Sequence, residues 1–149
     1  MKADGSRARH RSREVALQVL FALDVQQAKQ AGLVAQEVFE EVAAQFEMPE
    51  AAKVFAKELV CGVTEDLQQV DELLRSAARN WRLERMAVVD RNVLRLAAYE
   101  LLRTTTPVAV VIDEAVRMAK RFGDDPSSSF VNGVLDGVAR GLSGARGER

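Results

Sequence analysis

Residues 86–103 read MAVVDRNVLRLAAYELLR, and this stretch decides the fold class. Its apolar side chains recur three and four residues apart, which is the spacing of one helix face and not the alternation of a strand. The apolar positions are Val89, Val93, Leu94, Ala97, Ala98 and Leu101. Three charged side chains, Asp90, Arg91 and Arg95, group on the other side. The stretch therefore predicts an amphipathic helix with one buried face.

The same period recurs on both sides of this stretch, with turn residues between the patterns. The predicted helices cover about residues 13–28, 34–46, 56–74, 108–123 and 130–138. The third of them is expected to be long and unbroken. The sequence therefore predicts an all-α bundle of six or seven helices.

Two helix ends carry capping residues. Thr106 precedes Pro107, which predicts an N-cap followed by proline at the first helical position, where the missing N–H costs nothing. Gly123 follows the helical pattern and is predicted to close that helix in the left-handed conformation. The segment from Asp124 to Ser127 then predicts a turn into the last helix.

Length and composition favour one self-sufficient domain. The chain has 149 residues, of which 48% are apolar and 29% charged, so it is not a disordered tail. A chain of this size buries roughly 70% of its unfolded surface, which is enough for a core without metal or disulfide. We expect a basic, flexible N-terminal arm over 1–12, one all-helical domain over 13–142 and a frayed tail over 143–149.

Several classes of site are excluded by composition. One cysteine, Cys61, and one histidine, His10, are too few for an intramolecular disulfide or a zinc or iron–sulfur site. The sequence has no GxGxxG, GxxxxGK, HExxH or GxSxG motif, so we expect no catalytic residue, metal or cofactor. No apolar stretch reaches the length that spans a bilayer, so we expect a cytoplasmic protein without membrane contact. Trp81 and Cys61 are predicted to be packing residues.

The charges are unevenly distributed although the net charge is only −1. Residues 1–13 carry five basic groups against one acidic group, and residues 76–106 carry six against three. Residues 14–75 between them carry four basic groups against twelve acidic ones. This pattern indicates one anionic partner and a second, basic partner.

The first basic block alternates arginine with small or polar residues, at Arg7, Arg9, Arg11 and Arg13. Two steps along a helix rotate the side chain by about 200°, so these arginines would occupy opposite sides and leave no apolar face. Such a segment is expected to stay mobile until an anion orders it, as arginine-rich segments do on RNA. The alternative interpretation is a solubilising, disordered start.

The loop from Asp124 to Ser129 leads directly into Phe130. An aromatic ring near the first turn of a helix stacks well on an unpaired base, while backbone N–H groups there face a phosphate. The alternative is that Phe130 is the first core residue of the last helix.

Four collinear blocks of the sequence resemble the NusB family of bacterial transcription antitermination factors. They are REVALQVLF at 13–21, DRNVLRLAAYEL at 90–101, PVAVVIDEA at 107–115 continued by AKRFG at 119–123, and FVNGVLD at 130–136. The resemblance implies an all-α fold of about seven helices in two small bundles. It also implies binding of single-stranded boxA RNA in nascent ribosomal RNA, together with the ribosomal protein NusE.

In that family the RNA-bound pair acts in an elongation complex with RNA polymerase and other Nus factors, promotes read-through of terminators, and some members form homodimers. By position, the family's RNA-contacting residues fall on Arg9, His10, Arg11, Arg13 and Phe130. Its NusE-facing residues fall on Phe21 and Asp90, with Arg91 and Arg95 nearby. The sequence departs from the family at His10, often another arginine, and at Pro126, often an acid, which leaves contacts by residues 124–126 open.

Two other functions are compatible with the pattern. The first is a helical adaptor that binds only protein, with the arginines as solvation. The second is an RNA-binding domain related to ribosomal RNA 5-methylcytosine methyltransferases, without the catalytic part.

Overall fold

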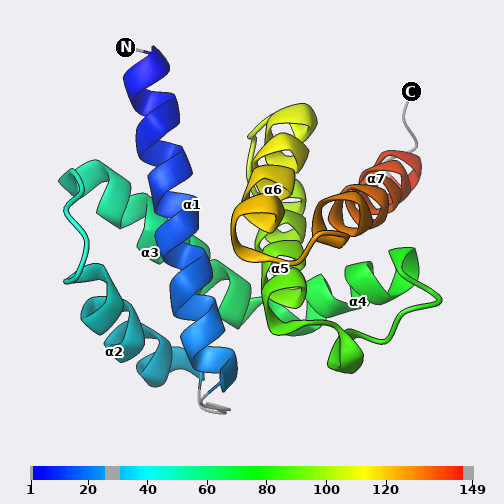
Figure 1. Ribbon diagram of the computed structural model, residues 1–149, viewed down its shortest axis with the longest axis horizontal. Helices are drawn as coiled ribbons and strands as arrows, with labels where there is room; N and C mark the ends of the chain where they lie inside the picture. Colours follow the sequence, from blue (N-terminus) through cyan, green and yellow to red (C-terminus); the bar gives the residue numbers. More distant parts are fainter. Residues whose placement is uncertain (1, 26–30, 146–149) are drawn as a thin grey trace. The chain divides into compact units, whose positions relative to one another are not determined.

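The computed structural model describes residues 2–25 and 31–145, and these form seven α-helices and one short 3-10 helix (Figure 1). The all-α prediction is confirmed. The chain divides into two compact units, residues 1–65 and 66–149. The expected limits of a single domain, 13–142, stay a prediction. Within the described residues, no helix is long and apolar enough to cross a membrane.

The first unit contains α1 (Lys2–Val25), α2 (Ala31–Ala43) and α3 (Glu50–Glu65). Each of the three helices packs against the other two. Their shared core includes the fully or almost fully buried side chains of Val15, Val19, Val38, Phe39, Leu59 and Val60.

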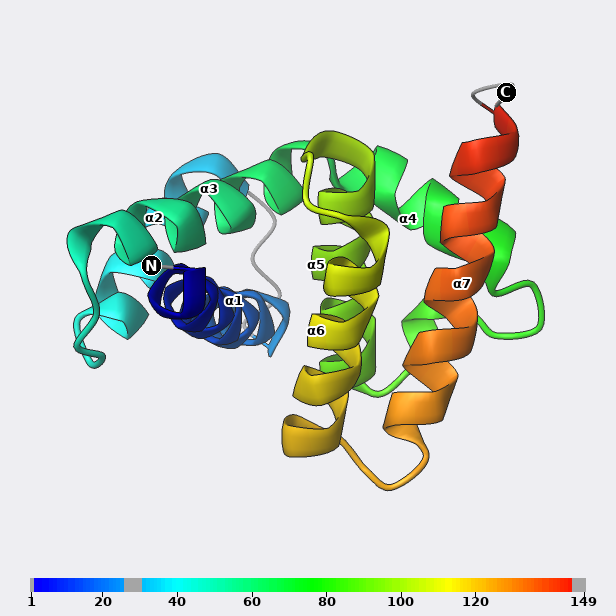
Figure 2. The same ribbon diagram turned by 90° about the horizontal axis from the view of Figure 1, so that it is seen from above.

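The second unit contains α4 (Leu67–Ala77), the 3-10 helix η1 (Leu83–Arg85), α5 (Val88–Arg103), α6 (Val108–Phe122) and α7 (Ser127–Ala145). Helix α5 contacts α4, α6 and α7, and α7 likewise contacts α4, α5 and α6 (Figure 2). The predicted apolar stripe of α5 is confirmed from Val93 to Leu101, whereas Val89 is half-buried.

Three predicted helix limits are wrong. Helix α1 begins at Lys2 and not near residue 13, so the basic segment is helical. Helix α2 ends at Ala43, which leaves Phe46 in the following turn. The long helix over 56–74 is two helices, interrupted at Asp66. Residues 26–28, at the predicted end of the first helix, and residues 146–149, in the predicted tail, lie outside the described residues. Helix α7 continues to Ala145, beyond the predicted end at residue 138.

The break at Asp66 has a local cause. Asp66 leaves helical geometry at φ −102° and ψ 20°, and its carboxylate accepts a hydrogen bond from Arg103 at 2.8 Å. Its carbonyl still accepts from the N–H of Val70 at 2.9 Å, which starts α4. A one-residue interruption leaves the apolar spacing nearly in phase, so periodicity alone does not show it.

Both predicted caps of α6 differ from the structure. The residue before the helix is Pro107, and no side chain caps it. Thr106 instead accepts a hydrogen bond from the hydroxyl of Thr104 at 3.3 Å. Gly123 has extended backbone, with φ −102° and ψ −168°, and not the left-handed conformation. It is glycine for space, because a Cβ there would lie 2.6 Å from Oγ of Ser127.

Candidate nucleic-acid interface

The basic segment of α1 is a formed part of the helix. Arg7, Arg9 and Arg11 are exposed, His10 is half-buried, and Arg13 is only 3% exposed. The helix therefore presents three of the four predicted arginines to solvent and encloses the fourth in the first unit.

Two aromatic residues that the sequence analysis missed support these arginines. The guanidinium of Arg9 lies 4.1 Å from the ring centre of Phe55 on α3, and that of Arg13 lies 5.6 Å from the same ring. The guanidinium of Arg11 lies 5.5 Å from the ring centre of Phe46. Cations at these distances are attracted to the ring faces. The predicted absence of packing for this segment is therefore wrong.

Polar contacts also anchor the segment. The hydroxyl of Ser12 is buried and donates to the carbonyl of Ala52 on α3 at 2.7 Å, with the carbonyl of Ala8 also near at 2.9 Å. Nε2 of His10 lies 3.0 Å from a carboxylate oxygen of Glu14, one turn later. Ser12 thus ties the basic turn of α1 to α3.

The predicted partner-facing residue of α1, Phe21, has 41% of its surface exposed, next to the buried Leu20. Its ring is therefore accessible to solvent, and its contact with NusE stays a prediction.

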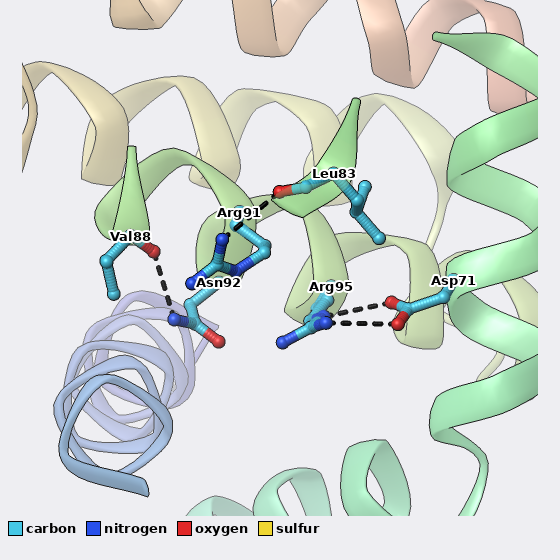
Figure 3. Close-up of polar contacts among 6 residues, drawn as sticks. All are labelled: Asp71, Leu83, Val88, Arg91, Asn92 and Arg95. Carbon is cyan, nitrogen blue, oxygen red and sulfur yellow. Dashed lines mark hydrogen bonds and ion pairs between the residues drawn. The ribbon is translucent and has the colours of Figure 1, made fainter. Parts of the chain in front are cut away.

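Arg91 and Arg95 make contacts within the second unit (Figure 3). Arg95 donates from Nε and Nη2 to the two carboxylate oxygens of Asp71 on α4, at 2.9 and 3.0 Å. Arg91 donates from Nη1 to the carbonyl of Leu83 in η1 at 3.1 Å. These arginines therefore hold α4 and η1 to α5; their predicted contact with NusE stays a prediction. No pattern in the sequence identifies Asp71 as the partner of Arg95.

Phe130 and Trp81 meet at one end of the second unit. Phe130 is half-buried in the first turns of α7, and its ring packs edge to face against Trp81, with centroids 5.2 Å apart. Trp81 is 60% exposed, so it is a packing residue at the surface of the unit and not a core residue.

A cavity of about 420 Å³ opens beside this aromatic pair, and we call it the Asp90 pocket. It is lined by Trp81, Arg85, Met86, Ala87, Asp90, Pro126, Ser129 and Phe130. Oδ1 of Asp90 is buried and has no hydrogen-bond partner. The structure thus brings together Asp90 and Phe130, which the sequence analysis assigned to different partners.

The loop before Phe130 is fixed by its own hydrogen bonds. The N–H of Asp124 donates to the hydroxyl oxygen of Ser127 at 3.1 Å, and the N–H of Ser127 donates to the carbonyl of Asp124 at 3.0 Å. Ser127 is 3% exposed. The N–H of Phe130 donates to the carbonyl of Pro126 at 3.1 Å, so the carbonyl of Pro126 helps to start α7.

Among the residues that the structure describes, Glu84 and Cys61 have shifted pKa values. A hydrogen bond from its own backbone N–H lowers the pKa of Glu84, and the positive charges of Arg82, Arg75 and Arg85 lower it further. The segment around η1 is therefore locally cationic. Partial burial raises the pKa of the Cys61 thiol. Among the described residues, no cluster of three or more histidine, cysteine, aspartate or glutamate side chains could hold a metal ion.

The sequence of this chain is similar to proteins of one family. The family model described as NusB family matches residues 10–140. The transcription antitermination protein NusB of Sorangium cellulosum is 51% identical over 136 residues, covering 91% of this chain and 94% of the relative. The protein of the same name from Anaeromyxobacter dehalogenans strain 2CP-1 is 48% identical over 147 residues, covering 95% and 97%.

Two solved structures share this fold. NusB of T. maritima has a TM-score of 0.79 and 37% identity, covering 89% of this chain and 90% of its own. A structure of antitermination factors NusB and NusE in complex with dsRNA has a TM-score of 0.78 and 27% identity, covering 91% and 98%.

Proposed function

Because this chain belongs to the NusB family, we propose that it is a transcription antitermination factor that binds boxA-type nascent ribosomal RNA together with NusE. In this role it promotes read-through by RNA polymerase in ribosomal RNA operons, as part of an elongation complex with other Nus factors. The proposal is supported by relatives named transcription antitermination protein and by a related NusB seen with NusE and dsRNA.

The observation that carries RNA binding is the set of three exposed arginines in the N-terminal half of α1. Arg7, Arg9 and Arg11 are exposed, and rings of the same unit hold the guanidiniums of Arg9 and Arg11. Planar guanidiniums suit phosphate geometry, and fixing them in advance reduces the ordering cost of binding. In this proposal the three arginines contact phosphates, His10 adds a hydrogen-bonding group, and the buried Arg13 supports the Phe55 ring.

For NusE, the proposal relies on Phe21 of α1 and on the head of α5. Phe21 offers an exposed aromatic surface of the kind enriched at protein interfaces. Arg91 and Arg95 set the position of that head through their contacts with Leu83 and Asp71. The chain acts by binding, with no catalytic step of its own, and a role on nascent RNA implies a cytoplasmic location.

The test is a titration of this protein with a boxA-type RNA and with an unrelated RNA of equal length, each with and without NusE. We expect tighter binding of the boxA-type RNA and a further gain when NusE is present. Equal binding of both RNAs, with no effect of NusE, would contradict the proposal. Binding of NusE with neither RNA would identify a helical adaptor that binds only protein.

A further inference from the structure

We propose that residues 75–85, which we call the arginine segment, form a second RNA-binding surface that holds nucleotides flanking the boxA-type element by their phosphates. The segment carries four arginines, Arg75, Arg79, Arg82 and Arg85. The inference rests on the proposed function, because it concerns RNA that is already bound through the boxA-type element. It adds a surface that the resemblance does not assign.

The arginines of the segment are exposed and do not hold the fold together. All four are exposed. Within the part of the chain that the structure describes, their guanidiniums donate no hydrogen bond and form no ion pair. By contrast, Arg95 and Arg103 of α5 each donate to an aspartate, at 2.9 and 2.8 Å. The fold therefore leaves the four cations of the arginine segment available to a ligand.

The segment also brings its charges together. Arg75 lies in the last turn of α4, Arg82 directly precedes η1 and Arg85 ends it, and η1 packs against α4. A hydrogen bond from its own backbone N–H lowers the pKa of Glu84, and the charges of Arg82, Arg75 and Arg85 lower it further. Three cations that are up to ten residues apart in the sequence thus act on one carboxylate.

Packing and hydrogen bonds hold the backbone of the segment in place. Leu74, Ala78 and Leu83 are buried, and the carbonyl of Leu83 accepts a hydrogen bond from Arg91 of α5 at 3.1 Å. The N–H of Ala78 donates to the carbonyl of Leu74 at 2.8 Å, and the N–H of Trp81 donates to the carbonyl of Ala78 at 3.0 Å. Cations on a fixed backbone lose less conformational freedom on binding than cations on a flexible one.

The chemistry of the cations indicates phosphate as the ligand. All the cations of the segment are arginines, and the planar guanidinium matches two phosphate oxygens at once. Contacts to phosphate carry no information about the base. We therefore expect the arginine segment to add affinity for RNA of any sequence.

The position of the segment favours RNA over an acidic protein as the source of the phosphate-like charge. Trp81, inside the segment, packs edge to face on Phe130, which the resemblance assigns to RNA, with ring centroids 5.2 Å apart. The loop before Phe130 carries two exposed acids, Asp124 and Asp125, which repel phosphates. RNA that contacts Phe130 is therefore expected to continue over the arginines and not over this loop.

The experiment compares three fluorescein-labelled RNAs by anisotropy, with NusE in excess. They are the boxA-type element alone and the element extended by about ten uridines at its 5′ end or at its 3′ end. An RNA runs through its site in one direction, so one end alone can reach the segment. For the unaltered protein we expect one extended RNA to bind on the order of tenfold tighter than the element alone at about 50 mM salt.

Loss of arginine charge tests the surface directly. For the extended RNA that binds tighter, Arg82→Gln should reduce the slope of log affinity against log salt by about 0.7, and Arg75→Gln with Arg82→Gln by about 1.4. Both variants should bind the element alone as before. Arg140→Gln is the matched control for Arg82→Gln, because Arg140 is an exposed arginine of α7 outside the segment. It should keep both the slope and the gain.

A variant of opposite sign excludes a general loss of structure as the cause. Glu84→Gln removes the acidic side chain that lies among the arginines. It should strengthen binding of the same extended RNA and leave binding of the element alone unchanged. Melting temperatures of all variants confirm that they fold.

The outcomes separate this inference from the proposed function. If the unaltered protein binds none of the three RNAs, both are wrong. If the element binds but neither extension adds affinity, both extensions add equally, or the double variant keeps the gain, only the second surface is wrong. Equal weakening of the element alone and of the extended RNA would place these arginines in the site of the element and overturn the inference. Loss of NusE binding in the double variant, with RNA binding intact, would overturn it in favour of a protein contact.

Discussion

The ion pair between Arg95 and Asp71 yields the sharpest prediction about stability. Two hydrogen bonds of 2.9 and 3.0 Å join the side chains, which are 17% and 11% exposed. Removing Arg95 leaves the Asp71 carboxylate nearly enclosed without this partner. Hydrogen bonds to charged groups contribute about 1.5–3 kcal/mol each, and breaking a buried pair costs about 3–5 kcal/mol. Because this pair keeps some solvent contact, we expect Arg95→Ala to lower the free energy of unfolding by about 3 kcal/mol.

The assay is urea unfolding followed by Trp81 fluorescence and circular dichroism, applied to Arg95→Ala, Asp71→Ala and the double variant. The double variant should lose less than the sum of the single losses, with a coupling energy of about 2 kcal/mol. Lys57→Ala is the matched control. Lys57 and Glu40 are 3.5 Å apart and 41% and 64% exposed, so its loss should cost under about 0.5 kcal/mol.

The same variants separate an internal role of Arg95 from a role at the NusE surface. If Arg95→Ala is as stable as the unaltered protein yet loses NusE affinity, the reasoning from the ion pair is refuted. If stability falls and the folded fraction still binds NusE normally, Arg95 acts by holding α4 to α5.

Three further outcomes follow from other parts of the chain. Replacing Arg9 and Arg11 together by alanine should reduce the slope of log affinity for single-stranded RNA against log salt by about 1.4, or 0.7 per lost phosphate contact, in fluorescence anisotropy; an unchanged slope would mean that neither contacts phosphate. Gly123→Ala should lower the free energy of unfolding by about 1–3 kcal/mol in chemical denaturation, because the new Cβ would lie 2.6 Å from Oγ of Ser127; an unaltered midpoint would show that the loop yields easily. Alkylation of Cys61 should accelerate only at higher pH than alkylation of a free cysteine, since partial burial raises its thiol pKa, and the difference should vanish in denaturant.

The sequence predicted those features that depend on local repetition. The apolar stripe of α5 is an example, because burial of one helix face requires the spacing seen from Val93 to Leu101. The limits of the helices depend on less regular causes. Asp66 interrupts a helix without shifting the apolar phase, and Gly123 is needed for the approach of Ser127 and not for a left-handed turn.

The site residues show the same division. The arginines of α1, Arg95 and the ring of Phe130 could be chosen from spacing and resemblance. The side chains that contact these arginines are distant in sequence. Phe55 lies more than forty residues from Arg9, and Asp71 lies 24 residues before Arg95. Single-sequence patterns carry no signal for such pairings. The unpartnered oxygen of Asp90 is likewise a property of packing, so only coordinates could show it.

The helical start of α1 has a thermodynamic consequence for RNA binding. Ordering a flexible residue costs about 1–2 kcal/mol of conformational entropy. If the seven residues from Arg7 to Arg13 folded only on RNA, this cost would weaken the free energy of binding by several kcal/mol. In this protein, folding of the first unit has already ordered these residues. Calorimetry should therefore give a heat-capacity change set by the contact surface alone, without the larger value that accompanies coupled folding. Truncating the side chains of Phe46 and Phe55 should make the entropy of RNA binding less favourable, because the arginines of α1 then have to be ordered on binding. The binding enthalpy should change less.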